Sequence, residues 1–174
     1  MTVTLATERL DLISASPELI DAVLAGRYGD AEAILGADIP EGWPSDTHSR
    51  AGLTIHLTAL QRDRRQEPWH VRLIVRRDER RTMGTVNLKG SPGPDGTVDL
   101  GWELEPSERH QGFATEAATA VSRWALSQPG VRRVTARIPS DNAASIRVAE
   151  RLGMRRTLER HPEQGLIWEI VRGI

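Results

Sequence analysis

The order of apolar and polar residues along the chain predicts a protein that mixes strands and helices. Residues 9–14 alternate between the two kinds, which is typical of a short strand. Ser16 and Pro17 then predict a helix start, because a serine side chain caps the free N–H groups and proline loses no hydrogen bond there. Apolar residues at helical spacing predict two further helices, over residues 30–35 and 46–64.

The period becomes that of strands in the middle of the chain. Residues 70–76, 82–89 and 96–104 alternate between apolar and polar side chains, so each predicts a strand. Glycines and prolines in residues 90–96 predict the hairpin loop that joins the last two. The third strand places Glu103 on its polar face.

Helices and strands alternate again in the last third of the chain. The order of the elements describes an α+β domain around a mostly antiparallel sheet, and the length favours one domain over residues 1–174. The expected elements are a helix at 112–126, a strand at 131–138, a helix at 143–152 capped by the cluster 140–142, and a closing hairpin of strands at 154–161 and 166–172.

Composition and charge narrow the function classes. Hydrophobic residues make up 39% and charged residues 27%, and the net charge of -1 gives no sign of bulk attraction to nucleic acid or membrane. The sequence has no cysteine, which excludes disulfides, thiolate metal sites and a cysteine nucleophile. The N-terminus does not resemble a signal peptide, and no apolar run has the length of a membrane span. We therefore expect a soluble cytoplasmic protein without nucleic-acid or membrane partners.

The turn between the third strand and the following helix predicts an anion cradle. Small residues at Gly112 and Ala114 let a ligand approach the main chain closely, and Thr115 follows with a hydroxyl. The N–H groups that open a helix lack intrahelical acceptors and lie at the positive end of its dipole. Phosphate is the favoured ligand.

Three phosphate-binding patterns compete for this turn. It lacks Gly-x-Gly-x-x-Gly and Gly-x-x-x-x-Gly-Lys-Ser/Thr, which disfavours a dinucleotide fold and nucleotide hydrolysis. Arg109-x-x-Gly112-x-Ala114 instead resembles the acetyl-CoA signature of the GNAT family of N-acetyltransferases. The segment from Asn142 to Met154 resembles that family's second CoA-contacting segment. With Thr7-Glu8-Arg9-Leu10-Asp11-Leu12, the spacing is especially similar to the ribosomal-protein (RimJ/RimL-type) subgroup.

The resemblance implies a fold, an activity and a cofactor site. The fold is a mixed, mostly antiparallel sheet of about seven strands flanked by helices, and the activity is acetyl transfer from acetyl-CoA to a primary amine. The main chain of Leu104 would bind the pantetheine arm as an added strand, with Asn142 opposite. The pyrophosphate would be held by Arg109, Gln111, Gly112, Phe113, Ala114 and Thr115.

The same resemblance implies two catalytic residues. Glu103 would take the proton of the amine, directly or through water. The alternative, equally compatible with the sequence, is that Glu103 is only an exposed polar residue of an alternating strand. Ser145 would give a proton to the departing sulfur, and the alternative is a hydroxyl bonded back to its own helix. Many family members have a tyrosine where this chain has Ala149, and Tyr28 is a poor substitute. With no cysteine, direct transfer in a ternary complex is preferred.

The remaining histidines and the acceptor are less constrained by the sequence. The spacing of His48 and His56 is too wide for a metal pair, so both are interpreted as surface or half-buried side chains. The other histidines, His70, His110 and His161, have no identifiable partner, and no metal site is expected. Trp43 lies between prolines and either lines a substrate pocket or covers the core.

Several acceptors and assemblies stay open at the level of sequence. A protein N-terminal amine follows from the subgroup resemblance, and a small-molecule amine is the alternative within the same reaction. A non-catalytic CoA-binding regulatory module is the alternative of another class. The protein is expected to be a monomer or a homodimer.

Overall fold

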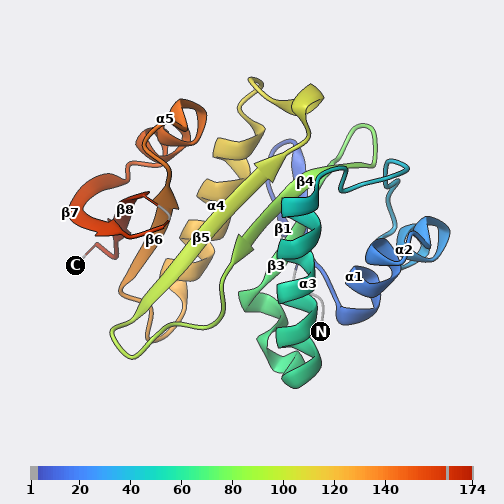
Figure 1. The fold of residues 1–174 in the computed structure, drawn as a ribbon, viewed down its shortest axis with the longest axis horizontal. Helices are drawn as coiled ribbons and strands as arrows, with labels where there is room; N and C mark the ends of the chain where they lie inside the picture. The colour runs from blue at the N-terminus through green and yellow to red at the C-terminus, as the bar shows by residue number, and fades with distance from the viewer. Residues whose placement is uncertain (1–3, 164, 174) are drawn as a thin grey trace.

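The framework of the molecule is a sheet of eight strands in the computed structural model, which describes residues 4–163 and 165–173 (Figure 1). Its order is β1-β2-β3-β4-β5-β6-β8-β7, and every neighbouring pair is antiparallel except the parallel pair β5 and β6. The strands are β1 (Thr4–Ala6), β2 (Leu10–Ser14), β3 (Val71–Arg76), β4 (Arg81–Leu88), β5 (Thr97–Leu104), β6 (Arg133–Ile138), β7 (Arg155–His161) and β8 (Gly165–Val171).

Helices cover both faces of this sheet (Figure 1). Three of them pack on the face that carries the odd-numbered residues of β3, and α4 and α5 pack on the opposite face. The helices of the described residues are α1 (Pro17–Leu24), α2 (Tyr28–Leu35), α3 (Thr47–Arg62), α4 (Phe113–Ser127) and α5 (Ala143–Arg151), with two 3-10 helices, η1 (Arg64–Trp69) and η2 (Pro106–Glu108).

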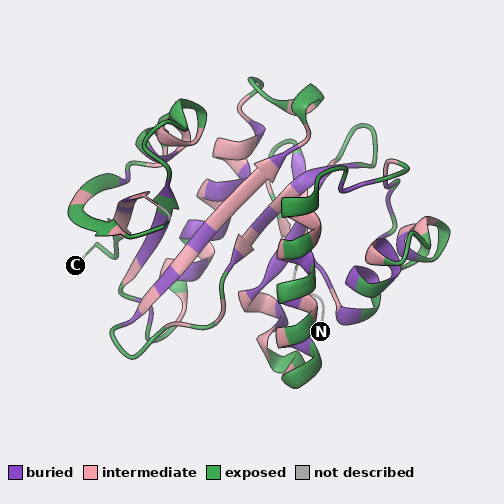
Figure 2. Cartoon of the chain, in the orientation of Figure 1, coloured by how far each residue is buried: buried purple, intermediate pink, exposed green. Residues whose placement is uncertain are grey.

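Two hydrophobic cores follow from the alternation along the central strands (Figure 2). On β3, Ile74 points toward α4, whereas Leu73 and Val75 point toward α1, α2 and α3. On β5, Leu100 and Leu104 belong to the core under α4 and are almost fully buried. The polar positions of β5 therefore face α3.

The structure confirms the expected fold class. The helix that begins at Pro17 has the predicted cap, since Ser16 Oγ accepts a hydrogen bond from the N–H of Leu19 at 3.2 Å. Three elements were not expected, namely β1, η1 and η2. Each has three to six residues, too few for a repeating apolar pattern to develop.

The sheet opens between β5 and β6. These two strands pair over three positions, Thr97 to Asp99 on β5 and Arg133 to Thr135 on β6. Beyond them, residues 100–104 of β5 pair with β4 alone. The carboxyl-terminal half of β5 thus has an unpaired main-chain edge, as an added strand requires.

A bulge on β4 aligns the end of β5 with its neighbour. The register between β3 and β4 shifts after Ile74, where Met83 is the extra residue. Gly84 follows at a φ of 156°, and a Cβ built there would lie 2.1 Å from the carbonyl oxygen of Glu103. Glycine at this position lets the backbones of β4 and β5 approach closely at Glu103.

Candidate functional site

The turn predicted as an anion cradle begins α4 as expected. Gly112 is the residue before the helix and has a φ of 83°, a left-handed conformation that glycine adopts without strain. No side chain caps this helix start. The N–H groups of residues 113–115 therefore stay available to a ligand, while the N–H of Glu116 bonds the Gly112 carbonyl at 3.0 Å.

Arg9 fastens the cradle to the edge of the sheet. Its Nη1 donates to the carbonyl of Gln111 at 3.0 Å, and its Nε donates to Glu116 Oε2 at 2.7 Å. Thr7 Oγ1 and the main-chain N–H of Arg9 both donate to Glu116 Oε1, at 2.6 and 2.9 Å. The guanidinium also lies 4.3 Å from the ring centre of Phe113. The segment that resembled the ribosomal-protein subgroup thus supports the cradle.

A cavity of about 460 Å³ lies at this helix start and extends to α5. It brings together residues that the sequence analysis had selected from three separate segments. Gln111 is not among its lining residues, and its carbonyl faces Arg9. The predicted residues that line the cavity are Glu103, Leu104, Arg109, Gly112, Phe113, Ala114, Thr115, Asn142 and Ser145.

Arginines give this cavity, called the cofactor groove below, a positive lining. Arg109 Nε donates to the Leu104 carbonyl at 3.0 Å, which ties the loop to the end of β5. Arg147 and Arg151 line the groove from α5. Neither arginine was expected at the site, although their spacing of four places both on one face of α5.

Asn142 and Ser145 enter the groove from the start of α5. Asn142 Oδ1 accepts a hydrogen bond from the N–H of Ser145 at 3.0 Å, so Asn142 caps the helix as its sequence context predicted. Ser145 is half-buried, and both residues line the groove. They lie across the groove from the residues of β5 and α4.

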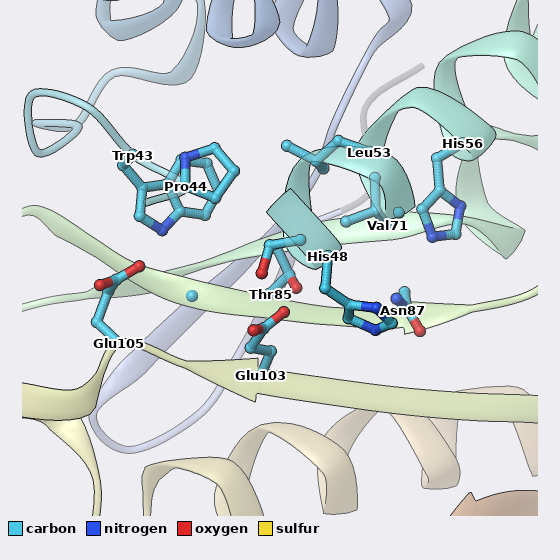
Figure 3. Close-up of a pocket in the computed structure, with 13 residues that line it drawn as sticks. Trp43, Pro44, His48, Leu53, His56, Val71, Thr85, Asn87, Glu103 and Glu105 are labelled. Atoms are coloured by element: carbon cyan, nitrogen blue, oxygen red, sulfur yellow. The ribbon is translucent and has the colours of Figure 1, made fainter. Parts of the chain in front are cut away.

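A second, smaller cavity of about 90 Å³ lies between α3 and the strands β4 and β5 (Figure 3). Trp43 lines it, although its side chain is also buried in the core of α1, α2 and α3. Trp43 therefore covers the core, as one interpretation held, and it also lines a cavity. The lining residues are Trp43, Pro44, His48, Ser49, Gly52, Leu53, His56, Val71, Gly84, Thr85, Asn87, Glu103 and Glu105.

His48 and Glu103 line both cavities. Glu103 comes from the open half of β5, and His48 comes from the first turn of α3. The second cavity, called the acceptor pocket below, therefore meets the cofactor groove at these two side chains. Sequence reasoning missed His48, because only the packing of α3 over β5 brings it to Glu103.

Glu105 adds a second carboxylate to the acceptor pocket (Figure 3). Burial and the negative charges of Glu103 and Asp46 raise the pKa of Glu105 above its usual range. Arg109 and a hydrogen bond from Trp43 oppose this rise in pKa without cancelling it. The carboxylates of this pocket thus repel one another, which favours a positively charged ligand.

His56 and His70 correct two expectations from the sequence. His56 is buried, with 6% of its surface exposed, and His70 is its partner, with 2.9 Å between the two Nδ1 atoms. In such a pair one nitrogen donates and the other accepts. Burial, the charge of His70 and that of Lys89 lower the pKa of His56 to about 4, and burial also lowers the pKa of His70. Both rings are therefore neutral at pH 7.

Metal-ligand clusters and membrane-spanning helices were also sought in the structure. No group of three or more possible metal ligands occurs among the residues that the structure describes. Within the same ranges, no helix is long and apolar enough to cross a membrane.

Comparisons with known proteins identify the relatives of this chain. The model of the acetyltransferase (GNAT) domain family matches residues 9–155. An uncharacterized N-acetyltransferase of Bacillus subtilis (strain 168), YjdG, is 31% identical over 87% of this chain and 89% of its own length.

Solved structures share the fold at lower identity. A ribosomal-protein-S5-alanine acetyltransferase from Vibrio fischeri superposes with a TM-score of 0.67 at 13% identity, covering 98% of this chain and 97% of its own. A ribosomal-protein alpha-N-acetyltransferase in complex with coenzyme A superposes with a TM-score of 0.65 at 15% identity. The match covers 97% of this chain and 98% of that one.

Proposed function

This chain belongs to the GNAT acetyltransferase family, and we propose that it moves the acetyl group of acetyl-CoA directly to a primary amine held in the acceptor pocket. The observation that carries the proposal is that a basic groove and an acidic pocket meet at Glu103 and His48. A cofactor with phosphates fits the first, and an amine fits the second.

The cofactor groove suits acetyl-CoA in its chemistry. The free N–H groups of residues 113–115 and the cations of Arg109, Arg147 and Arg151 favour phosphate oxygens. A side chain at position 112 would meet Arg9 Nη2 at 3.4 Å, in a conformation that favours glycine. The open edge of β5 at residues 100–104 offers main-chain groups to the amide-bearing arm of the molecule.

Acetyl-CoA supplies an acetyl thioester, and the residues at the junction supply the proton transfers. Glu103 accepts a proton from the ammonium group, which leaves a neutral amine able to attack the carbonyl carbon. The carbon–nitrogen bond forms, the carbon–sulfur bond breaks, and the nitrogen releases its second proton to solvent to become a neutral amide. Ser145, on the opposite wall of the groove, donates its hydroxyl proton to the departing thiolate and regains one from solvent.

Two sources of the amine are compatible with this site. A protein N-terminus is supported by the likeness of the fold to ribosomal-protein acetyltransferases, and that likeness is one of fold alone. A small-molecule amine is supported by the modest volume of the acceptor pocket, about 90 Å³. Both sources use the same proton transfers.

Thiol release from acetyl-CoA in the presence of an amine panel tests the proposed function. We expect turnover with at least one primary amine, and we expect Glu103→Gln to lower kcat by about a hundredfold through loss of the base. Glu108→Gln is the matched control, because Glu108 follows in η2 and lines neither cavity. An unchanged rate and pH profile in Glu103→Gln would remove Glu103 from the mechanism.

The cradle has its own test. Gly112→Glu places a negative side chain at the start of α4, so we expect calorimetry to detect no coenzyme A binding. Circular dichroism checks that the variant is folded. Unchanged affinity in a folded Gly112→Glu protein would show that the phosphates bind elsewhere.

A further inference from the structure

The polar lining of the acceptor pocket includes two carboxylates, which accept hydrogen bonds and donate none when ionised (Figure 3). Glu103 and Glu105 point two carboxylates at it from β5 and the residue after it. Thr85 and Asn87 line it from β4, and Asn87 Oδ1 is buried without a hydrogen-bond partner among the described residues. That oxygen has almost no accessible surface, so the acceptors that the pocket offers to a ligand are its two carboxylates.

The Asn87 amide packs against a glycine of the neighbouring strand. It pairs with Gly101 of β5, and a Cβ built at Gly101 would lie 2.5 Å from Asn87 Oδ1. Any larger residue at position 101 would displace the amide. Asn87 Oδ1 therefore fills the space that a side chain at position 101 would need.

Lysine and arginine side chains do not line this pocket. None of its lining residues among the described part of the chain is a lysine or an arginine. Arg109 lines the cofactor groove instead and bonds the Leu104 carbonyl, and Lys89 is paired with Asp99 at 3.1 Å. His56 is neutral at pH 7, because its pKa is lowered to about 4. Arg109, whose charge lowers the pKa of Glu105 only in part, is thus the cation nearest to these carboxylates and lies outside the pocket.

We propose that the acceptor is a cationic primary amine with a second hydrogen-bond donor close to the amine and no carboxylate beside it. Aminoacyl amides, such as the first residue of a peptide, and polyamines meet this description. Free α-amino acids do not, because their carboxylate would enter beside Glu103 and Glu105 in a pocket lined by no lysine or arginine. This inference rests on the proposed function and deepens it by naming the substrate class.

A matched pair of amines tests the inference. Alaninamide and alanine differ in the group beside the amine, amide against carboxylate. With acetyl-CoA and a thiol-release readout, we expect kcat/KM to be at least about tenfold higher for alaninamide. An amidated tripeptide and a diamine form two further arms, and the one with the higher kcat/KM identifies the source of the natural amine.

A variant shows whether the preference for alaninamide comes from the charge of the pocket or from the different pKa values of the two amines. The amine of alaninamide loses its proton more easily, and that advantage is the same for every variant. Glu105→Gln removes one carboxylate, so we expect it to reduce the ratio of the two kcat/KM values by about threefold. Glu108→Gln, which lines neither cavity, leaves that ratio unchanged. Retained coenzyme A affinity shows that both variants are folded.

The outcomes distinguish this inference from the function on which it rests. Equal or faster acetylation of alanine overturns the inference and leaves the acetyltransferase activity in place. A ratio that is the same in wild type and Glu105→Gln also overturns it, because the preference then comes from the amines alone. Absence of thiol release with every amine overturns the proposed function itself.

Discussion

At the scale of single residues, the position of Glu103 depends on a glycine of the neighbouring strand. Gly84 lies opposite the end of β5, and its missing Cβ leaves space for the Glu103 carbonyl. The bulge at Met83 sets the register that brings the two together. A residue without any catalytic group thus determines where the proposed base lies.

Gly84→Ala tests this dependence. The new Cβ would overlap the Glu103 backbone, so we expect the free energy of unfolding to fall by about 2 kcal/mol and turnover to fall further than coenzyme A affinity. Urea unfolding, thiol release and calorimetry measure the three quantities. Gly29→Ala is the control, because no heavy atom lies within 4 Å of its Cβ and alanine favours a helix. Wild-type turnover in Gly84→Ala would contradict the assignment.

The buried histidine pair makes stability depend on pH. The pKa of His56 is about 4 in the folded protein and 6.5 in an ordinary setting, so the folded state resists protonation. The unfolded chain binds the proton more readily, and stability is full above pH 6.5 and falls as the pH drops toward 4. For one such residue the loss between pH 7 and 5 is about 2 kcal/mol.

His56→Gln isolates this contribution, since glutamine does not titrate. We expect the free energy of unfolding of the wild type to decrease more steeply between pH 7 and 5 than that of the variant. Urea titrations at a series of pH values give both curves. Parallel curves would mean that His56 keeps its ordinary pKa in the folded protein.

At the scale of elements, the cofactor loop is shaped by a segment a hundred residues away. Arg9 holds the Gln111 carbonyl and the Glu116 carboxylate, and thereby joins the start of β2 to the first turn of α4. Burial raises the pKa of Glu116, but the bonds from Thr7 and Arg9 outweigh burial and lower it overall. The ion pair therefore persists throughout the neutral range.

Loss of the Arg9 hydrogen bonds should lower the affinity for coenzyme A more than it lowers the stability of the fold. Arg9→Ala loses charged hydrogen bonds worth about 1.5 kcal/mol, so we expect the Kd for coenzyme A to rise about tenfold. Calorimetry measures it, with Arg64→Ala as a control that breaks an exposed ion pair to Glu18 in another part of the surface. Equal affinities in the two variants would show that the loop keeps its shape alone.

At the scale of the whole molecule, the end of β5 lies between two cavities of opposite charge. The cofactor groove, with its arginines, lies between β5, α4 and α5. The acceptor pocket, with its carboxylates, lies on the other face of β5 under α3. The end of β5 thus lines both cavities, and in the proposed function a phosphate-bearing cofactor would be attracted to one side and an amine to the other.

Ligand binding across this opening should stabilise the fold. Coenzyme A would contact β5, α4 and α5 together, so at a concentration a hundredfold above its Kd we expect about 2.7 kcal/mol of added stability and a Tm higher by roughly 5–10 °C. A thermal melt with and without coenzyme A measures the shift. Gly112→Glu serves as the control, because its melt should not respond. A wild-type Tm that coenzyme A leaves unchanged would contradict the assignment of the groove as the coenzyme A site.

The sequence determined the local features of this protein. Apolar periodicity, the Ser16 cap and the glycine turn at Gly112 depend on residues close in the chain, so the main helices and strands and the turn before α4 were predictable. Short elements such as β1 and η1 lacked a repeating pattern. The resemblance carried by Arg109 to Thr115 and by Asn142 to Met154 indicated the family.

The tertiary structure alone decided the rest. His56 meets His70, Arg72 is fully buried beneath Trp124, and His48 shares two cavities with Glu103, in each case through elements that only packing brings together. The direction in which a helix such as α3 crosses a sheet depends on the sum of many contacts between distant residues, which no local pattern encodes. For this reason the glycine turn that begins α4 could be predicted from the sequence, and the pocket lined by Glu103 and Glu105 could not.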